Sequence, residues 1–291
     1  MSGGAGDVGA EPRVLRLDGR AVADYVWRPE LPEGLSPRPY LHPVRTPSGT
    51  AVTELMPEDH RHHLGVSLAV ADVGGANFWG GRTFVAGRGP VTLPNHGVQR
   101  HHRWESASDT ALAHELRWTG PGGAALLRER RRIAAVPLDE RAWALDFGFE
   151  LTNLTASPLA FASPAVNGRP GAGYGGFFWR ARRGGRRVRV VGPDAAGERG
   201  LHGARTAWLS LHASGEAPWT LVFVAADEGD PWFVRSGDYL GVGASLAWSA
   251  PLMAAPGAGP RRRIITVVAD GDLDRPATLA LVAAARAHDE A

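Results

Sequence analysis

The feature that most constrains the fold is an alternation of large apolar residues with small or polar residues within Ala142–Asn153. A period of two is the spacing of side chains on a β-strand that is buried on one face. In this run the residues on the apolar face are Trp143, Leu145, Phe147, Phe149 and Leu151. Further strand-like runs occupy residues 64–70, 101–106, 110–118, 124–136, 159–163, 186–191, 206–212, 219–225 and 261–269.

Turn-forming residues separate these runs. The chain has 38 Gly and 22 Pro, both above the usual share, which favours many turns. A strand–turn–strand spacing of roughly 8–12 residues is typical of a sandwich or barrel. We therefore predict an all-β chain that forms a large antiparallel β-sandwich or supersandwich. Asp274 as N-cap and Pro276 in the first turn predict a short C-terminal helix over residues 276–288.

The chain has no fixed internal repeat and no long polar linker. We therefore expect one β-sandwich domain over residues 12–291. Residues 1–11 are rich in Gly and Ala, and we expect them to form a disordered tail. They show neither a positive nor an apolar segment, and no run approaches the roughly 18 apolar residues that span a bilayer. A cytoplasmic protein without a membrane partner is the expectation, and the pattern predicts no oligomeric state.

The composition excludes several kinds of site. Cysteine is absent, so a thiolate nucleophile, a disulfide framework and Cys-ligated metals are excluded. All 32 basic residues are arginine, against 30 acidic residues, and a net charge of +2 produces no strong field for polyanions. Arginine clusters at residues 128–132 and 180–189 lie in strand-like surroundings without the aromatic–basic modules of known binders. We expect no nucleic-acid partner.

The densest cluster of titratable residues is Glu58–His63, which holds His60, His62 and His63. Histidine is the usual acid/base near neutral pH and the commonest metal ligand. On a strand, residues two apart share a face, so we expect His60 and His62 to converge while His63 points away. Glu58 or Asp59 would orient an imidazole or act as a base. The alternative is a solvated turn before a strand.

A second group of histidines lies at residues 96–102. His96 follows a turn and is a candidate third imidazole, so that His60, His62 and His96 could bind a divalent metal ion. No carboxylate follows within residues 64–70, which argues against a cupin-type metal site. His101 and His102 alternate on a strand, so one of them is expected to face solvent. His114 is interpreted as structural or surface.

The segment 167–180 combines glycines with aromatic residues. Glycines let the backbone approach a ligand closely, and aromatic rings stack on sugars. The alternative is a wide loop that closes onto a core aromatic strand. The candidate substrate-binding residues of the whole chain are His42, Arg61, His63, Asn167, Tyr174, Trp179 and Arg180.

Four segments together resemble the bacterial family labelled "methane oxygenase PmoA-like", a domain of unknown function, over about residues 15–270. They are Arg38–Pro43, Asp59–Gly65, Asn77–Gly80 and Gly171–Arg180. The resemblance implies a carbohydrate setting, because relatives often lie beside sugar-catabolic oxidoreductases. In length and strand density the chain is also similar to aldose-1-epimerase-like β-supersandwiches. That second similarity implies a sugar-handling architecture, but no carboxylate of this chain matches the catalytic base.

These observations predict a small-molecule substrate, with carbohydrate the leading class. The first hypothesis is an enzyme for epimerisation, elimination or hydrolysis at a sugar carbon, each of which requires a positioned proton transfer. His60, His62 and His96 would be acid/base groups or metal ligands. The second hypothesis is a sugar-binding β-sandwich without catalysis. The third is an oxygenase with iron or copper held by histidines, which would need two His and one carboxylate to converge.

Overall fold

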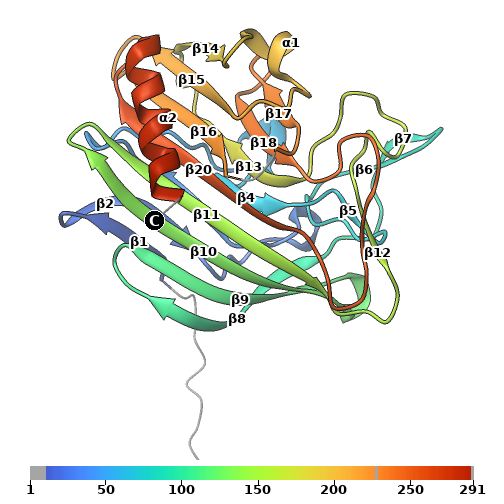
Figure 1. The fold of residues 1–291 in the computed structure, drawn as a ribbon. Helices are drawn as coiled ribbons and strands as arrows, with labels where there is room; N and C mark the ends of the chain where they lie inside the picture. Colours follow the sequence, from blue (N-terminus) through green and yellow to red (C-terminus); the bar gives the residue numbers. More distant parts are fainter. Residues whose placement is uncertain (1–10, 227–228, 290–291) are drawn as a thin grey trace, which may run out of the picture.

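A computed structural model describes residues 11–226 and 229–289, and it consists mainly of two large antiparallel sheets (Figure 1). The tail expected at the N-terminus therefore lies, apart from Glu11, outside the described residues. The all-β antiparallel sandwich with a short C-terminal helix is confirmed. No helix among the described residues has the length and apolar character that a membrane crossing requires.

The first large sheet has seven strands. In spatial order they are β1 (Arg13–Leu17), β2 (Arg20–Val26), β3 (Tyr40–Val44), β4 (Val66–Ala69), β13 (Gly176–Arg180), β18 (Gly241–Ser245) and β17 (Trp232–Arg235).

The second large sheet has eight strands. In spatial order they are β14 (Arg187–Val191), β15 (Trp208–Ser214), β16 (Trp219–Ala225), β20 (Arg261–Asp270), β11 (Ala142–Asn153), β10 (Ala125–Asp139), β9 (Ala111–Thr119) and β8 (Val98–Ala107).

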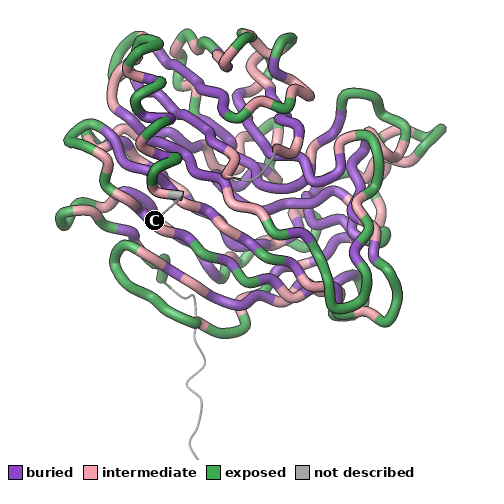
Figure 2. The backbone as a smooth tube through the Cα atoms, viewed as in Figure 1, coloured by how far each residue is buried: buried purple, intermediate pink, exposed green. Residues whose placement is uncertain are grey.

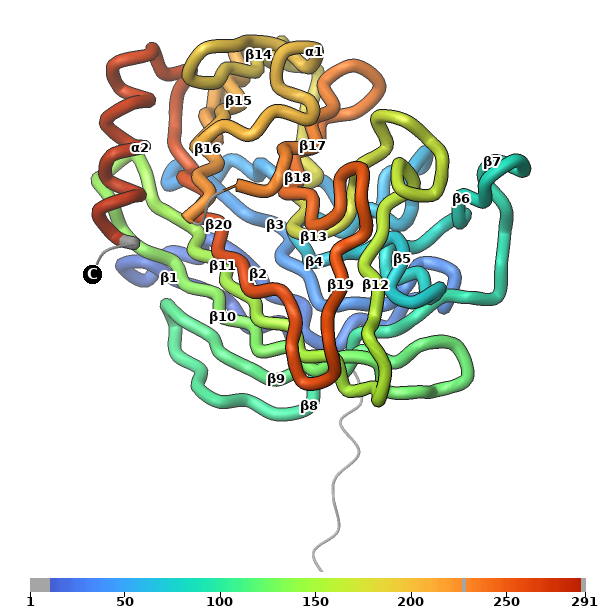
Figure 3. The backbone as a smooth tube through the Cα atoms, turned by 45° about the vertical axis from the view of Figure 1, so that its right-hand side comes forward, coloured from blue at the N-terminus to red at the C-terminus, as the bar shows by residue number. Residues whose placement is uncertain are grey.

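Two small sheets and a few short helices complete the fold. In Figure 3 the strands β19, β12 and β5 of the three-stranded sheet lie side by side at one end of the molecule. The elements are β19 (Leu252–Ala254), β12 (Leu159–Ala162), β5 (Asp72–Val73), β6 (Thr83–Val85), β7 (Gly89–Val91), α1 (Gly197–Leu201), α2 (Arg275–Asp289) and the 3₁₀ helices η1 (Glu33–Leu35), η2 (Glu58–His60) and η3 (Pro121–Gly123).

The main core lies between the two large sheets. The alternation in β11 places Leu145 and Phe147 there, together with Leu41 of β3 and Trp179 of β13 from the opposite sheet. Figure 2 shows that buried residues follow the strands, whereas exposed residues gather in the connecting loops. Interdigitation of the two inner faces is the usual way a sandwich removes apolar surface from water.

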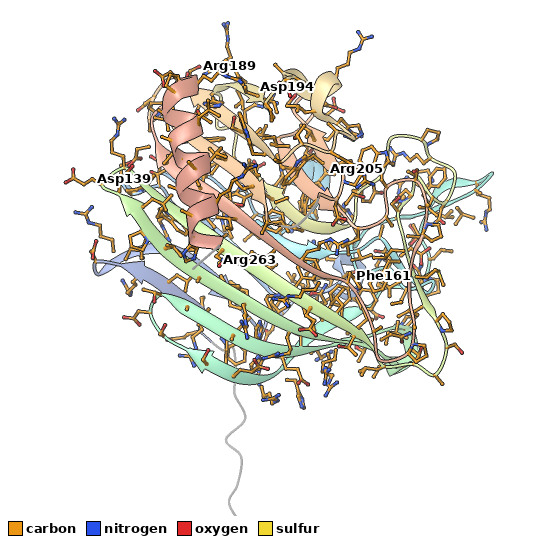
Figure 4. All side chains as sticks on the ribbon, viewed as in Figure 1. Asp139, Phe161, Arg189, Asp194, Arg205 and Arg263 are labelled. Carbon is orange, nitrogen blue, oxygen red and sulfur yellow. The ribbon has the colours of Figure 1, made fainter. Side chains whose placement is uncertain are left out.

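The C-terminal helix covers the outer face of the eight-stranded sheet. Its N-cap is Asp274, whose carboxylate accepts a hydrogen bond from the backbone N–H of Ala277 at 2.9 Å. Near the other end of α2, Arg263 (labelled in Figure 4) pairs with Asp146 at 2.9 Å. The helix buries apolar residues of both partners: Ala142, Ala144, Val222, Val224, Ile265, Val267, Leu281, Val282 and Ala285.

The outer face of the seven-stranded sheet is also partly covered. The strand-like run at residues 64–70 is buried on both faces, since Ser67 and Ala69 are fully buried as well as Val66 and Leu68. Loops and aromatic side chains lie over this part of the sheet. This covered outer face holds the candidate site.

Candidate functional site

A cluster of aromatic residues lies on the outer face of the seven-stranded sheet, over β4, β13 and β17. Its buried aromatic members are Trp79, Phe178 and Phe233, which lie with Ala69 and Ala71. Tyr174, Tyr239 and Trp248 are partly buried and pack against them. The strand parity of β13 explains the placement, since side chains alternate between the two faces of a strand. Phe178 and Arg180 face outward, whereas Phe177 and Trp179 face the core.

Trp179 was predicted to contact substrate, and the structure places it elsewhere. Its ring is fully buried between the two large sheets, where it packs against Phe223 with ring centroids 5.6 Å apart. Its indole N–H donates to the backbone oxygen of Val52 at 3.4 Å. Composition alone indicated a stacking aromatic, but strand parity turns this one inward.

Three histidines converge at the edge of the aromatic cluster. Residues 58–60 form η2, and the turn continues because the N–H of His63 donates to the backbone oxygen of His60 at 2.9 Å. The ring centroids lie 5.8 Å apart for His60–His62, 4.6 Å for His60–His63 and 4.8 Å for His62–His63. The expectation that His63 points away is wrong, because it assumed an extended strand where the chain forms a tight turn.

Arg38 holds the backbone around this histidine cluster (His60, His62 and His63). Its side chain is buried, and the guanidinium donates to the backbone oxygens of His62 at 2.7 Å and Trp79 at 3.0 Å. It also donates to the Ser67 hydroxyl at 3.2 Å. One residue thus ties the histidine turn to β4 and to the loop at residue 79. Arg38 was not among the predicted site residues.

His63 is the most buried of the three imidazoles. Arg180 lies beside it, with a guanidinium nitrogen 3.3 Å from the Nδ1 atom of His63. Because arginine only donates, Nδ1 must accept, and the proton of the neutral ring sits on Nε2. Burial lowers the pKa of His63 far below its usual value, with further lowering by His62 and His60. His63 therefore presents a fixed N–H donor.

Arg180 is itself held in place by two contacts. Its Nε–H donates to a Glu54 carboxylate oxygen at 2.9 Å. The guanidinium also lies over the ring of Tyr239, 4.7 Å from the centroid. Burial raises the pKa of Tyr239, so its phenol stays protonated. Arg180 was a predicted substrate contact, whereas Tyr239 and Glu54 were not among the predicted site residues.

His62 is neutral and half-buried. Burial lowers its pKa to about 3, and the charges of Arg38 and His60 contribute further. Within residues 11–226 and 229–289 no side-chain hydrogen bond is made by its ring nitrogens. A Cβ on Gly81 would lie 3.0 Å from Nδ1 of His62, and one on Gly80 would lie 2.8 Å from the His62 Cβ. Glycine is required there, because the loop passes directly against the imidazole.

His60 is the most accessible imidazole of the cluster. Its side chain is 32% exposed, and Nδ1 lies 2.8 Å from a carboxylate oxygen of Asp59. The hydrogen bond to His60 is the main reason that the pKa of Asp59 is lowered. A carboxylate on Nδ1 leaves Nε2 as the proton acceptor. Glu58 and Arg61 are exposed on the same turn, and neither contacts an imidazole ring in the part of the chain that the structure describes.

The remaining site candidates lie around the cluster and do not enter it. His96 is buried and lies 2.7 Å through Nε2 from the backbone oxygen of Gly81, so it supports the glycine loop from behind. His42 bonds the Thr53 hydroxyl through Nδ1 at 2.9 Å. The Asn167 amide donates to Asp72 at 3.1 Å.

The proposed metal ligands are not assembled. Among the described residues, no group of three or more His, Asp or Glu side chains is placed to hold a metal ion. His96 uses Nε2 for a backbone contact, and Asp59 is bonded to His60 alone among the imidazoles. The geometry therefore gives no support to His60, His62 and His96 as a metal triad.

The aromatic cluster continues away from the histidines. Tyr174, one of the predicted substrate contacts, lies against Trp79 with ring centroids 4.6 Å apart and against Phe233 at 5.6 Å. His202 packs edge-on against Phe233 at 5.2 Å, and its ring lies within 3.0 Å of a guanidinium nitrogen of Arg235. The face thus combines neutral imidazoles, phenols and indoles with two arginines that have carboxylate partners.

Comparisons with known proteins identify relatives but no activity. The model of a protein family described as a family of unknown function, DUF6807, matches residues 13–283. This match overturns the resemblance to a PmoA-like family, to which nothing points. No curated protein matches. A solved structure of heparinase III with methylated lysines aligns at 8% identity over 60% of this chain and 22% of that one, with a TM-score of 0.25. The chain thus spans about a fifth of that structure (22%), and a likeness this low supports no conclusion about fold or function.

Proposed function

We propose that this chain, which belongs to the DUF6807 family of unknown function, is a carbohydrate-active enzyme with its site at the histidine cluster. The reaction class is a proton transfer at a C–H or C–O bond of a sugar, as in epimerisation, elimination or hydrolysis at a sugar carbon. The observation that carries the proposal is the Asp59–His60 pair beside His63, whose other ring nitrogen accepts from Arg180. This arrangement sets a proton acceptor next to a polarised donor.

His60 is the proposed base. Its Nδ1–H donates to Asp59, so Nε2 is the nitrogen that accepts a proton. The Asp59 carboxylate stabilises the imidazolium that forms, as a carboxylate does in other acid/base pairs. His60 also stacks on His63, and its 32% exposed side chain can reach a ligand on the surface.

His63 is the proposed donor to the substrate oxygen. Proton removal from a carbon beside a carbonyl shifts the electron pair toward that oxygen, which becomes an oxyanion. The His63 Nε2–H and the positive charge of Arg180 behind it stabilise this developing charge. The donor needs no reorganisation, because Arg180 fixes the tautomer before any ligand binds.

The surroundings favour a neutral, hydroxyl-rich ligand. His62 is uncharged and without a protein partner within the described ranges, so it can donate to or accept from a hydroxyl. The aromatic residues Tyr239 and Tyr174 are only partly buried and provide surfaces for the C–H face of a sugar ring. Arg180 and Arg235 are already paired with Glu54 and Glu198, which reduces their attraction for highly charged ligands.

A second function, sugar binding without catalysis, is favoured by one observation. The pKa of about 3 leaves His62 neutral throughout the physiological range and makes it a poor base. In that case all three imidazoles would only hydrogen-bond the ligand. The two functions differ in whether the sugar is chemically changed, which for epimerisation or elimination includes exchange of a carbon-bound proton with solvent.

The test is a panel of aldoses, ketoses and uronic acids incubated in D₂O and followed by proton NMR. The proposal expects deuterium to enter one sugar, and His60→Gln to slow the exchange by roughly 100-fold or more. His42→Gln is the matched control, because His42 bonds Thr53 outside the cluster. Saturation-transfer contact with a sugar, with neither exchange nor new product signals, would establish binding alone. No contact with any sugar would refute the carbohydrate assignment.

A further inference from the structure

A second cavity lies away from the outer-face site, between the end of β2 and strand β8. Its volume is about 520 Å³, and its lining includes Trp27, Glu30, Gln99, Arg100 and His101. The indole N–H of Trp27 donates to the backbone oxygen of Glu11 at 3.1 Å, and the guanidinium of Arg28 lies over the Trp27 ring, 4.3 Å from its centroid. His101 is the imidazole in this lining, and it is hydrogen-bonded to a buried network.

The network starts from an ion pair deep in the core. Arg131 and Glu129 of β10 are both fully buried, with 2.6 Å between Nε and the nearer carboxylate oxygen. The same carboxylate accepts from the Trp118 indole N–H at 2.8 Å, and Arg131 also donates to Gln99 at 3.1 Å. Burying two charges is costly unless every donor and acceptor is paired. Here the remaining guanidinium nitrogen continues the network outward.

Three hydrogen bonds connect Arg131 to the cavity. Arg131 donates to the Tyr25 hydroxyl oxygen at 3.2 Å, and that hydroxyl lies 2.8 Å from Nε2 of His114. Nδ1 of His114 lies 2.9 Å from Nδ1 of His101. Tyr25 and His114 are buried, whereas His101 is only half buried.

The direction of these hydrogen bonds is determined by their first member. Arginine can only donate, so the Tyr25 oxygen accepts from Arg131, and its own proton goes to Nε2 of His114. Burial raises the pKa of Tyr25, which keeps this proton in place. His114 is neutral because burial lowers its pKa to about 2, so its single proton is on Nδ1 and points to His101.

His101 is consequently left with its proton on Nε2. Burial and the nearby Arg28 lower its pKa to about 4, so the ring is neutral near pH 7. The described residues provide no hydrogen-bond partner for this Nε2–H, and none for the exposed guanidinium of the adjacent Arg100. Two neighbouring donors of the lining thus have no hydrogen-bond partner among the described residues, and Arg28 adds another guanidinium to the same lining.

We infer that this cavity is a second ligand site, for a small cyclic carboxylate. The carboxylate would accept from His101 Nε2–H and from Arg100, and its ring would lie against Trp27. A carboxylate only accepts hydrogen bonds, which matches the donors of His101 and Arg100. Glu30 also lines the cavity and disfavours a second negative charge, so the ligand carries one carboxylate and an otherwise neutral ring.

The test compares benzoate with its neutral isostere benzamide by calorimetry and by ¹⁵N NMR of labelled histidines. Benzoate is expected to bind at least tenfold more tightly than benzamide, and to shift the Nε2 resonance of His101. Arg100→Gln, an exposed change, should remove most of this preference. Tyr25→Phe should weaken benzoate binding by a smaller factor, because it releases the tautomer of His114.

The ¹⁵N spectrum tests the network even without ligand. A protonated Nδ1 on His114 and a protonated Nε2 on His101 are expected. Equal affinity for the two probes, no binding of either, or the opposite tautomer of His101 would overturn the inference. None of these outcomes bears on sugar exchange at the histidine cluster, which His60→Gln tests separately.

Discussion

The two groups of imidazoles in this protein are built in opposite ways. His60, His62 and His63 meet through their rings, with centroids 4.6 to 5.8 Å apart, and each ring has different polar neighbours. His114 and His101 meet through a direct hydrogen bond in a chain that begins at Arg131. In the first group only His60 has a carboxylate partner on its ring, whereas the directed chain that begins at Arg131 fixes the position of every proton.

The charged group behind each set explains what it can do. Asp59 stands behind His60, so a proton arriving on that ring is stabilised by a carboxylate. Arg131 stands behind Tyr25 and His114, where a positive charge opposes a further proton. The first set therefore suits proton transfer and the second suits binding through a fixed donor.

The largest effect is expected at the start of the directed chain. Arg131→Met leaves the Glu129 carboxylate buried without its cation, and loss of one partner of a buried pair costs about 3–5 kcal/mol. Unfolding in urea measures the loss. The control is Glu105→Gln, which breaks the exposed pair with Arg130 and should cost less than about 1 kcal/mol. Similar losses for the two variants would mean that the buried pair does not anchor the chain.

A pH-dependent effect follows from the neutral state of His114. Its pKa in the folded protein is about 2, below the ordinary value of 6.5. Below pH 6.5 the unfolded chain binds a proton that the folded protein does not, so the free energy of unfolding decreases as the pH is lowered. Between pH 7 and pH 4.5 this histidine accounts for a loss of about 2.5 kcal/mol.

The measurement for His114 is the free energy of unfolding at the two pH values. His114→Gln keeps an acceptor for the Tyr25 hydroxyl but cannot titrate, so its pH-dependent loss should be smaller than that of the wild type by about 2.5 kcal/mol. An identical pH dependence in both proteins would show that His114 is charged in the folded state, and the directed chain would then be wrong.

A smaller effect is expected where the glycine loop passes the outer cluster. Gly80 has a φ of +97°, and a Cβ there would lie 2.7 Å from the Leu35 backbone oxygen and 2.8 Å from the His62 Cβ. Gly80→Ala should therefore cost about 2 kcal/mol by thermal unfolding and displace His62. Gly87 has a φ of +73° with nothing within 4 Å of its Cβ position, so Gly87→Ala reports backbone strain alone, about 1 kcal/mol. Equal costs would remove the steric argument for this loop.

The sequence was sufficient where the structure depends on local periodicity. The alternation in β11 is a property of neighbouring residues, so its buried face could be predicted residue by residue. Asp274 likewise caps α2 through a contact three residues along the chain. The same reasoning failed at His63 because a strand period was applied to a 3₁₀ turn, and the period decides which side chains converge.

The parts that could not be predicted depend on contacts between distant segments. Arg38 reaches His62 and Trp79 across the sheet, and no local pattern marks which arginine will be buried. Tyr25 and His114 are 89 residues apart, so His114 could only be interpreted as a lone histidine. The role of Trp179 depended on strand parity relative to the core, which composition does not contain.

The most direct test of the central claim compares two variants in one assay, deuterium entry into the sugar identified by the panel. Asp59→Asn removes the carboxylate behind His60 and should slow exchange by roughly 100-fold. Tyr25→Phe disrupts the directed chain and should leave exchange within about twofold of the wild type, since that chain moves no proton in the reaction. Unchanged exchange in Asp59→Asn, or a comparable loss in Tyr25→Phe, would contradict the account.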